Sequence, residues 1–132
     1  MTEPPSTAEP AAPVYNSRGG LQRVWRAAGY SWAGLRAAVR HEAAFRQELV
    51  VGAALLLLLP WVAPGRWQGL AMAASIVLVW IVELLNSAIE ALADAVSAEH
   101  HPLLGRAKDL GSAAVMLSLV LVALVWVVAL WP

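Results

Sequence analysis

The chain contains no cysteine, which excludes disulfide bonds and thiolate metal sites. It also has little charge, because only 14% of its 132 residues are charged and nine basic residues balance nine acidic ones. A protein that binds nucleic acid carries a basic excess, which is absent here. The phosphate-binding pattern GxxxxGKS/T is missing too, and Gly19-Gly20 does not belong to a GxGxxG pattern. We therefore expect no nucleic-acid partner.

Apolar side chains dominate the composition. They make up 60% of the residues, and the mean hydropathy of +0.64 is too high for a small soluble domain. Seven tryptophans are present, and several flank the apolar runs, namely Trp61, Trp67, Trp126 and Trp131. Tryptophan at the ends of apolar segments is typical of the membrane–water interface. The composition therefore predicts an all-α integral membrane protein.

The chain divides into a short tail and a membrane domain. Residues 1–19 are rich in proline and small polar side chains, which predicts a disordered tail. Residues 20–46 show apolar positions at helical spacing with arginines on the remaining faces, which predicts an amphipathic helix on the membrane surface, bent near Gly29. The membrane domain as a whole is expected to cover residues 20–132.

Three spanning helices are expected at residues 47–64, 67–93 and 111–131. A helical break is predicted at residues 99–105, because Pro102 follows two histidines there. Basic residues concentrate before the first span and between the second and third. By the positive-inside rule this distribution predicts a cytoplasmic N-terminus and a periplasmic C-terminus in the inner membrane.

A polar stripe interrupts the second apolar run. Glu83, Asn86, Ser87, Glu90 and Asp94 follow one another at steps that place them on one face of a single helix. A carboxylate at membrane depth is costly, so an acid such as Glu83 indicates a functional site.

Several charged residues are predicted to converge at the cytoplasmic interface. Glu42, Glu90 and Asp94 provide carboxylates, and Lys108-Asp109 enter the interface at the head of the third span. Carboxylates without cysteine suit Mg²⁺ better than zinc, and Mg²⁺ binds few protein carboxylates together with substrate phosphates. A neighbouring lysine supplies the positive charge that a phosphate requires. This combination fits metal-assisted phosphoryl transfer from a nucleotide.

The spacing along the stripe suits two different tasks. Glu83 and Glu90 are seven residues apart, or about 10 Å along a helix. Glu90 would hold the metal, while the deeper Glu83 would accept a proton from a hydroxyl group in the bilayer. Asn86 and Ser87 are expected to orient Glu83 by hydrogen bonds, whereas Asp94 either supports the site or only solvates the helix end. These residues alone do not distinguish a kinase from a proton-coupled transporter.

Four stretches of the chain closely resemble the prokaryotic diacylglycerol kinase family. They are AAGYSW at residues 27–32, EAAFRQE at 42–48, VELLNSAIE at 82–90 and GRAKDLGSAA at 105–114, and the resemblance covers nearly all of the chain after residue 20. It implies a homotrimer of the inner membrane, with a surface helix and three spans in each subunit. It also implies transfer of the ATP γ-phosphate to diacylglycerol, which gives phosphatidic acid.

The resemblance also implies roles for individual residues. Glu83 would be the general base, and Glu42 and Glu90 would be the Mg²⁺ ligands. The residues expected to contact ATP are Arg23, Tyr30, Glu42, Glu90, Glu99, His100, His101, Lys108 and Asp109. The residues expected near the lipid are Arg23, Ala27, Ala28, Gly29, Tyr30, Ser31, Trp32, Arg46, Gln47, Glu48, Trp61, Glu83 and Ser112. Asn86, Ser87 and Asp94 would support the site.

Two positions depart from the family pattern. Ala33 stands where a lysine is usual after Tyr-Ser-Trp, and His41 replaces an asparagine before the Glu-Ala-Ala motif. Two alternatives stay open, a kinase for another lipid alcohol such as undecaprenol and a small proton-coupled transporter. Because one protomer has little surface to enclose both substrates, we expect sites shared between subunits, with Arg23 and Glu42 from one chain and the remaining catalytic residues from its neighbour.

Overall fold

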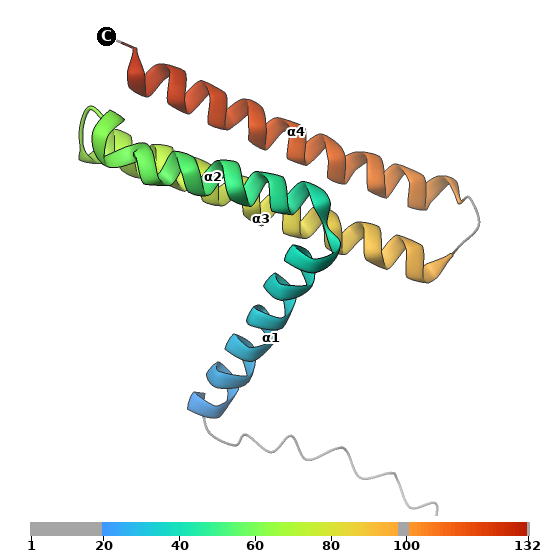
Figure 1. Ribbon diagram of the computed structural model, residues 1–132. Helices are drawn as coiled ribbons and strands as arrows, with labels where there is room; N and C mark the ends of the chain where they lie inside the picture. The colour runs from blue at the N-terminus through green and yellow to red at the C-terminus, as the bar shows by residue number, and fades with distance from the viewer. Residues whose placement is uncertain (1–19, 98–100, 132) are drawn as a thin grey trace, which may run out of the picture. The chain divides into compact units, whose positions relative to one another are not determined.

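The computed structural model of the protein describes residues 20–97 and 101–131, and every regular element within those ranges is an α-helix (Figure 1). The elements are α1 (Gly20–His41), α2 (Ala43–Val62), α3 (Arg66–Val96) and α4 (Pro102–Leu130). The predicted all-α class is confirmed. The chain forms two compact units that meet after Trp32. The predicted tail at 1–19 lies outside the described residues.

Helix α1 is amphipathic and runs without interruption past Gly29, where we expected a bend. It also ends earlier than the predicted residue 46, because Glu42 leaves helical geometry with φ −100° and ψ 110°. The last carbonyl groups of a helix lack partners within the helix. Arg46 supplies them here, since its Nη1 donates to the carbonyl oxygens of Val39 and Arg40 at 3.2 and 3.4 Å. This contact satisfies the end of α1 with a side chain from the first turn of α2.

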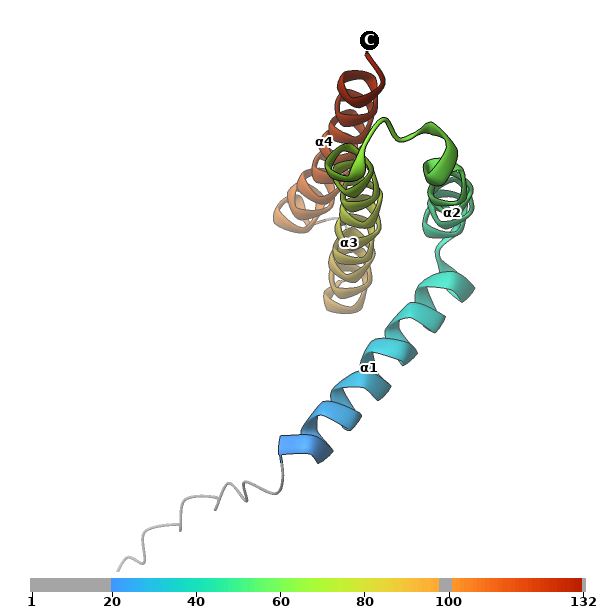
Figure 2. The ribbon, with the colours of Figure 1, turned by 90° about the vertical axis from the view of Figure 1, so that its left-hand side faces the viewer.

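The three helices that follow are each long enough to cross a membrane and contain an apolar stretch of 18 residues, with a mean hydropathy over that stretch of 1.5 in α2, 2.0 in α3 and 2.9 in α4. The three predicted spans are therefore confirmed. Helix α3 packs against both α2 and α4 and lies between them (Figure 2). The polar stripe found in the sequence is thus on the central helix of this unit.

The start of α4 differs from the prediction. We expected a break through residue 105 and a span from residue 111, but the helix already begins at Pro102. Proline is well suited to the first helical position, because it fixes φ and its missing N–H has no partner there in any case. His101 caps the N-terminal end of α4, since its Nδ1 accepts a hydrogen bond from the Leu103 N–H at 3.3 Å. Pro102 therefore starts a helix instead of extending the break.

The core lies mainly along α3. Its buried residues lie on one face of the helix, with Ser75 and Ile76 adjacent and the other steps of three, four or seven positions, and they are Met72, Ser75, Ile76, Val79, Glu83, Asn86 and Ala93. From α2, Phe45 is buried to 2% exposure. Most apolar side chains of α4 are exposed on this chain, which suits a helix that faces lipid.

The contact between α2 and α3 depends on a glycine. A Cβ atom at Gly52 would lie only 2.7 Å from Cζ2 of Trp80 and 2.8 Å from Cγ2 of Ile76. The Trp80 indole N–H donates across the interface to the backbone carbonyl oxygen of Glu48 at 3.1 Å. The flat surface at Gly52 therefore lets the indole lie against α2 and fixes the register of the two helices.

Candidate active site

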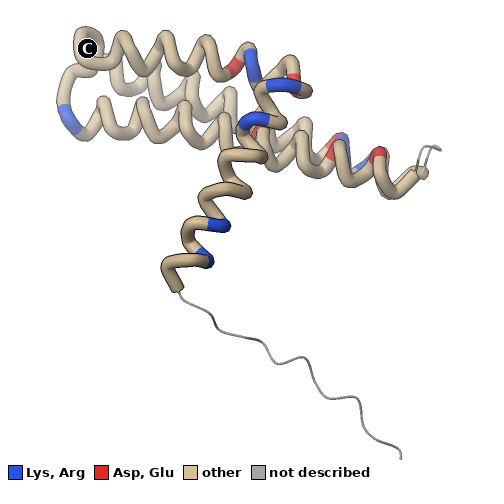
Figure 3. Tube along the Cα trace, turned by 60° about the horizontal axis from the view of Figure 1, so that its bottom comes forward, with Lys and Arg blue, Asp and Glu red and all other residues tan. Residues whose placement is uncertain are grey.

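The polar stripe on α3 runs from the protein core toward the helix end. Glu83 and Asn86 are buried, with 4% and 8% exposure, whereas Glu90 is half-buried and Asp94 is exposed. Figure 3 shows that the charged residues of the spanning helices gather toward the end opposite the C-terminus, apart from one basic residue near the α2–α3 turn, which is Arg66, the first residue of α3. The site therefore joins a buried acid to a polar surface at one end of the spans.

Four carboxylates lie in one neighbourhood. Those of Glu42 and Glu90 are close enough to Glu83 to repel it electrostatically, and Glu48 is close enough to interact with Glu83 in the same way. Because repulsion among partly buried acids is unfavourable, a bound cation would stabilise this cluster. Within 20–97 and 101–131, no three side chains are arranged to enclose a metal ion by themselves. Such a donor set fits Mg²⁺, which typically uses one or two carboxylates and completes its shell with substrate phosphates and water.

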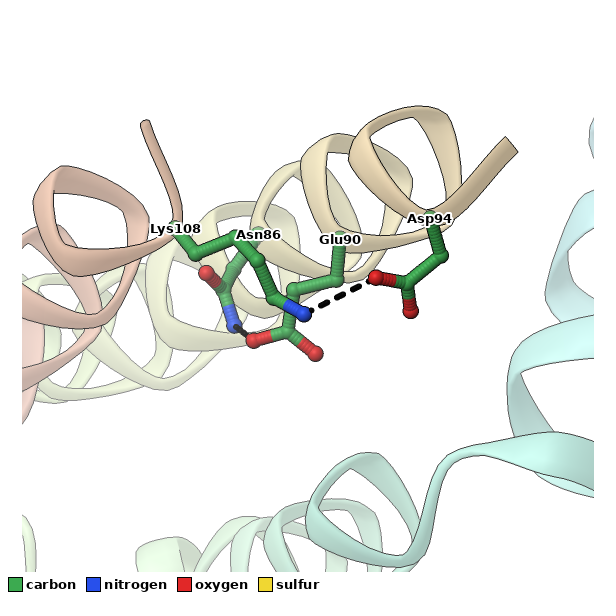
Figure 4. A network of polar contacts seen from close by, with 4 residues as sticks. All are labelled: Asn86, Glu90, Asp94 and Lys108. Carbon is green, nitrogen blue, oxygen red and sulfur yellow. Dashed lines mark hydrogen bonds and ion pairs between the residues drawn. The ribbon is translucent and has the colours of Figure 1, made fainter. Parts of the chain in front are cut away.

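Two side-chain contacts organise the surface end of the site (Figure 4). The Asn86 Nδ2 donates to Glu90 Oε1 at 3.1 Å, within α3. The Lys108 Nζ donates to Asp94 Oδ1 at 3.0 Å, and this ion pair joins α4 to α3. Asn86 therefore orients Glu90, although we had expected it to orient Glu83.

Lys108 is the only lysine of the chain. Its side chain is 40% exposed and that of Asp94 is 72% exposed, so water screens their attraction. A screened pair of this kind can open without a large cost, which leaves the ammonium group available to a phosphate. Asp109 and Ser112, on the same helix, are exposed.

The sequence-predicted residues of α1 belong to the first compact unit. Arg23, Tyr30 and the run of residues 27–32 are all exposed on that helix. The Ser31 hydroxyl donates to the backbone carbonyl oxygen of Ala27 at 3.0 Å, within its own helix. Within one chain the structure thus brings Glu42 near Glu83 and pairs Lys108 of α4 with Asp94 of α3, although we had expected Glu42 to reach the site from a neighbouring chain. The α1 residues form a separate set.

The predicted residues between α3 and α4 are only partly covered. Glu99 and His100 lie outside the described residues, and His101 forms the helix cap already described.

The α2 residues that we expected near the lipid substrate lie in three different places. Arg46 binds the end of α1, whereas Trp61 is 80% exposed toward the other end of the helix. Gln47 and Glu48 line a cavity of about 380 Å³, whose other walls are almost entirely apolar. The Glu48 Oε2 is buried and has no hydrogen-bond partner among the described residues. The wall of this cavity is therefore apolar apart from Gln47 and Glu48.

Sequence reasoning missed three residues that shape the site, Gly52, Trp80 and Gly111. Trp80 stands in the middle of an apolar run rather than at its end, a position that argues against a role at the interface and for a packed indole. Gly52 and Gly111 each interrupt an apolar helix, where glycine is unfavourable without a packing reason. The sequence therefore shows that these glycines are unusual, but only the structure shows which side chains pack against them.

The fold and the site define a small helical membrane protein with an acid-lined site at one end of its spans. Comparison with known proteins identifies it further, because the model of the family described as prokaryotic diacylglycerol kinase matches residues 29–130. The chain belongs to this family.

Relatives in several bacteria cover most of the chain. A diacylglycerol kinase of Escherichia coli strain K12 is 46% identical over 116 residues, which are 88% of this chain and 95% of the relative. A diacylglycerol kinase of Pseudomonas aeruginosa is 45% identical over 112 residues, or 85% of this chain and 91% of the relative. A diacylglycerol kinase of Haemophilus influenzae is 39% identical over 107 residues, or 81% and 91% of the two chains.

Proposed function

We propose that the protein phosphorylates diacylglycerol, using ATP as the phosphoryl donor and Mg²⁺ as the metal, to give phosphatidic acid. The observation that carries this proposal is the buried Glu83 beside Glu90, with Lys108 at the edge of the same stripe. Its family and relatives name the lipid substrate.

Glu90 and Glu42 are the residues that would hold the metal, because both carboxylates are close enough to Glu83 to interact with it electrostatically. When bound, Mg²⁺ supplies positive charge to the ATP phosphates and offsets the repulsion among the acids. The hydrogen bond from Asn86 supports this assignment, since it fixes Glu90 through a neutral donor and does not neutralise the carboxylate.

Glu83 is the proposed general base. The hydroxyl oxygen of the lipid attacks the γ-phosphorus of ATP, and its proton passes to the Glu83 carboxylate. The new oxygen–phosphorus bond forms as the bond between the γ-phosphorus and the β,γ-bridging oxygen breaks, and ADP leaves. Burial of Glu83 at the core end of the stripe supports this role, because it keeps the acid away from bulk water.

Lys108 is proposed to pair with phosphate oxygens after its bond to Asp94 opens. The rest of the proposed nucleotide contacts follow from the family resemblance and are Arg23, Tyr30, Glu99, His100, His101 and Asp109.

The lipid is proposed to lie against the other end of this acid cluster. The cavity beside Gln47 and Glu48 suits an amphipathic molecule, because its walls are mostly apolar and these two polar residues are among those that line it. The remaining residues proposed near the lipid are Arg23, Ala27, Ala28, Gly29, Tyr30, Ser31, Trp32, Arg46, Trp61 and Ser112.

We also propose that the protein works as a homotrimer in the inner membrane, with a cytoplasmic N-terminus and active sites shared between subunits. The many exposed apolar side chains of the spans support further burial against lipid or another subunit. The arginines of α1, Arg46 near the start of α2, and Arg106 and Lys108 near the start of α4 support the orientation by the positive-inside rule.

The test is a transfer assay with γ-labelled ATP and purified protein in mixed micelles. We expect label in phosphatidic acid when diacylglycerol is supplied, and loss of that product when Mg²⁺ is chelated. Preferential labelling of undecaprenol would instead identify a kinase for another lipid alcohol. Proton flux in proteoliposomes with no labelled lipid under any condition would identify a transporter and overturn the proposal.

A further inference from the structure

Helices α3 and α4 make their closest approach at a glycine. Gly111 is buried on α4, and a Cβ atom added there would overlap the Asn86 side-chain oxygen, Oδ1. The same Cβ would lie 3.3 Å from Asn86 Cγ but 3.8 Å from Asn86 Cα, which is an ordinary contact distance. The added Cβ would thus overlap the side-chain amide of Asn86 and not the backbone of α3.

The amide of Asn86 has one orientation that suits its surroundings. Its nitrogen faces the Glu90 carboxylate and donates to Oε1 at 3.1 Å, while its oxygen faces Gly111. The reverse orientation would place an oxygen against a carboxylate oxygen, with no proton between them. Asn86 Oδ1 is buried and has no hydrogen-bond partner within the part of the chain that the structure describes. The amide is therefore held by a single hydrogen bond and by the space that Gly111 leaves.

We propose that Gly111 is a positioning residue for the metal site. Its lack of a side chain lets the Asn86 amide occupy the rotamer that donates to Glu90 Oε1, and this bond fixes the Glu90 carboxylate toward the divalent cation. The inference rests on the proposed role of Glu90 as a metal ligand. It adds a residue of a different helix that would act on the metal only through Asn86.

Gly111→Ala tests this inference, with binding of Mn²⁺ as the readout. The protein in mild detergent is mixed with a non-hydrolysable ATP analogue, and free Mn²⁺ is measured by electron paramagnetic resonance. Loss of a partner that orients a metal ligand typically weakens metal affinity by 10- to 100-fold, so we expect about a tenfold weaker Mn²⁺ affinity. Gly105→Ala is the matched control on α4, because nothing lies within 4 Å of a Cβ at that position.

A double-mutant cycle separates positioning from a general effect on helix packing. If Gly111 acts through Asn86, adding Gly111→Ala to Asn86→Ala should cause no further loss of Mn²⁺ affinity. The shorter side chain also removes the overlap, so the double variant should fold even where the single variant is damaged. Losses that multiply in the double variant would overturn the proposal, as would a double variant that does not fold.

Glu90→Gln distinguishes failure of this inference from failure of the proposed function. Unchanged Mn²⁺ affinity in Glu90→Gln would show that Glu90 is not a ligand, and it would overturn both the proposed metal role of Glu90 and the role of Gly111. Weaker affinity in Glu90→Gln with unchanged affinity in Gly111→Ala would overturn the role of Gly111 alone. The two variants together therefore decide the proposal.

Discussion

Substitution of Gly52 by alanine should destabilise the protein by disturbing the contact between α2 and α3. The added Cβ would stand 2.7 Å from Trp80 and 2.8 Å from Ile76, well inside the carbon–carbon contact distance of about 3.5–4.0 Å. Neither neighbour can retreat simply, because Trp80 is bound to the Glu48 carbonyl oxygen and Ile76 is buried. Overpacking of this kind costs about 1–3 kcal/mol.

Alanine also favours a helix over glycine by about 0.5–1 kcal/mol, and this gain must be subtracted. Gly34→Ala provides the reference, because Gly34 lies within α1 and has nothing within 4 Å of its added Cβ. The free energy of unfolding is measured in mild detergent by titration with sodium dodecyl sulfate, with helix content as the signal. We expect Gly52→Ala to be less stable than Gly34→Ala by about 1–3 kcal/mol.

The same measurement in a Trp80→Leu background shows whether the indole is responsible. Removing the ring should relieve part of the cost of Gly52→Ala, since Ile76 would still be crowded. Equal stability of the Gly52→Ala and Gly34→Ala variants would refute the proposed packing of Trp80 against α2.

Three further predictions concern the proposed site. Glu42→Gln and Glu90→Gln should each raise the Mg²⁺ concentration that gives half-maximal turnover, and excess Mg²⁺ should restore part of the rate. A loss of turnover that excess Mg²⁺ does not restore would argue against metal binding by these residues. An amine-reactive reagent should label Lys108 and the amino terminus alone, and ATP with Mg²⁺ should slow labelling of Lys108; an unchanged rate would exclude a nucleotide contact. Mixed trimers of Arg23→Ala and Glu83→Gln protomers should recover activity that neither parent has, whereas verified co-assembly without recovery would place every catalytic residue in one chain.

The sequence was sufficient to predict the helical class, the three spans and the stripe on α3. Each of these depends on a periodic pattern, and a span of apolar residues forms a helix because the membrane interior offers its backbone no other partner. The spacing from Glu83 to Asp94 likewise determined which residues share a face. The family was also recognisable, because its motifs recur in order along the chain.

Helix boundaries and the hydrogen-bond partners of side chains were harder to predict, since they depend on contacts that the local sequence pattern does not specify. The end of α1 at His41 depends on the reach of Arg46 back to two carbonyl oxygens. The bond from Asn86 to Glu90 rather than to Glu83 reflects a rotamer that is set beside α4, and no pattern within α3 specifies it. Lys108 and Asp94 are 14 residues apart, so their pairing required the turn between α3 and α4 to be known.

The most direct test of the proposed chemistry is the turnover of Glu83→Gln at saturating ATP and diacylglycerol. Glutamine keeps the shape of the side chain but cannot accept the proton, so the rate should fall by about 100- to 10,000-fold. Helix content, thermal stability and ATP affinity, measured on the same sample, should stay at wild-type values. A variant that keeps more than about a tenth of the wild-type turnover would show that Glu83 is not the base.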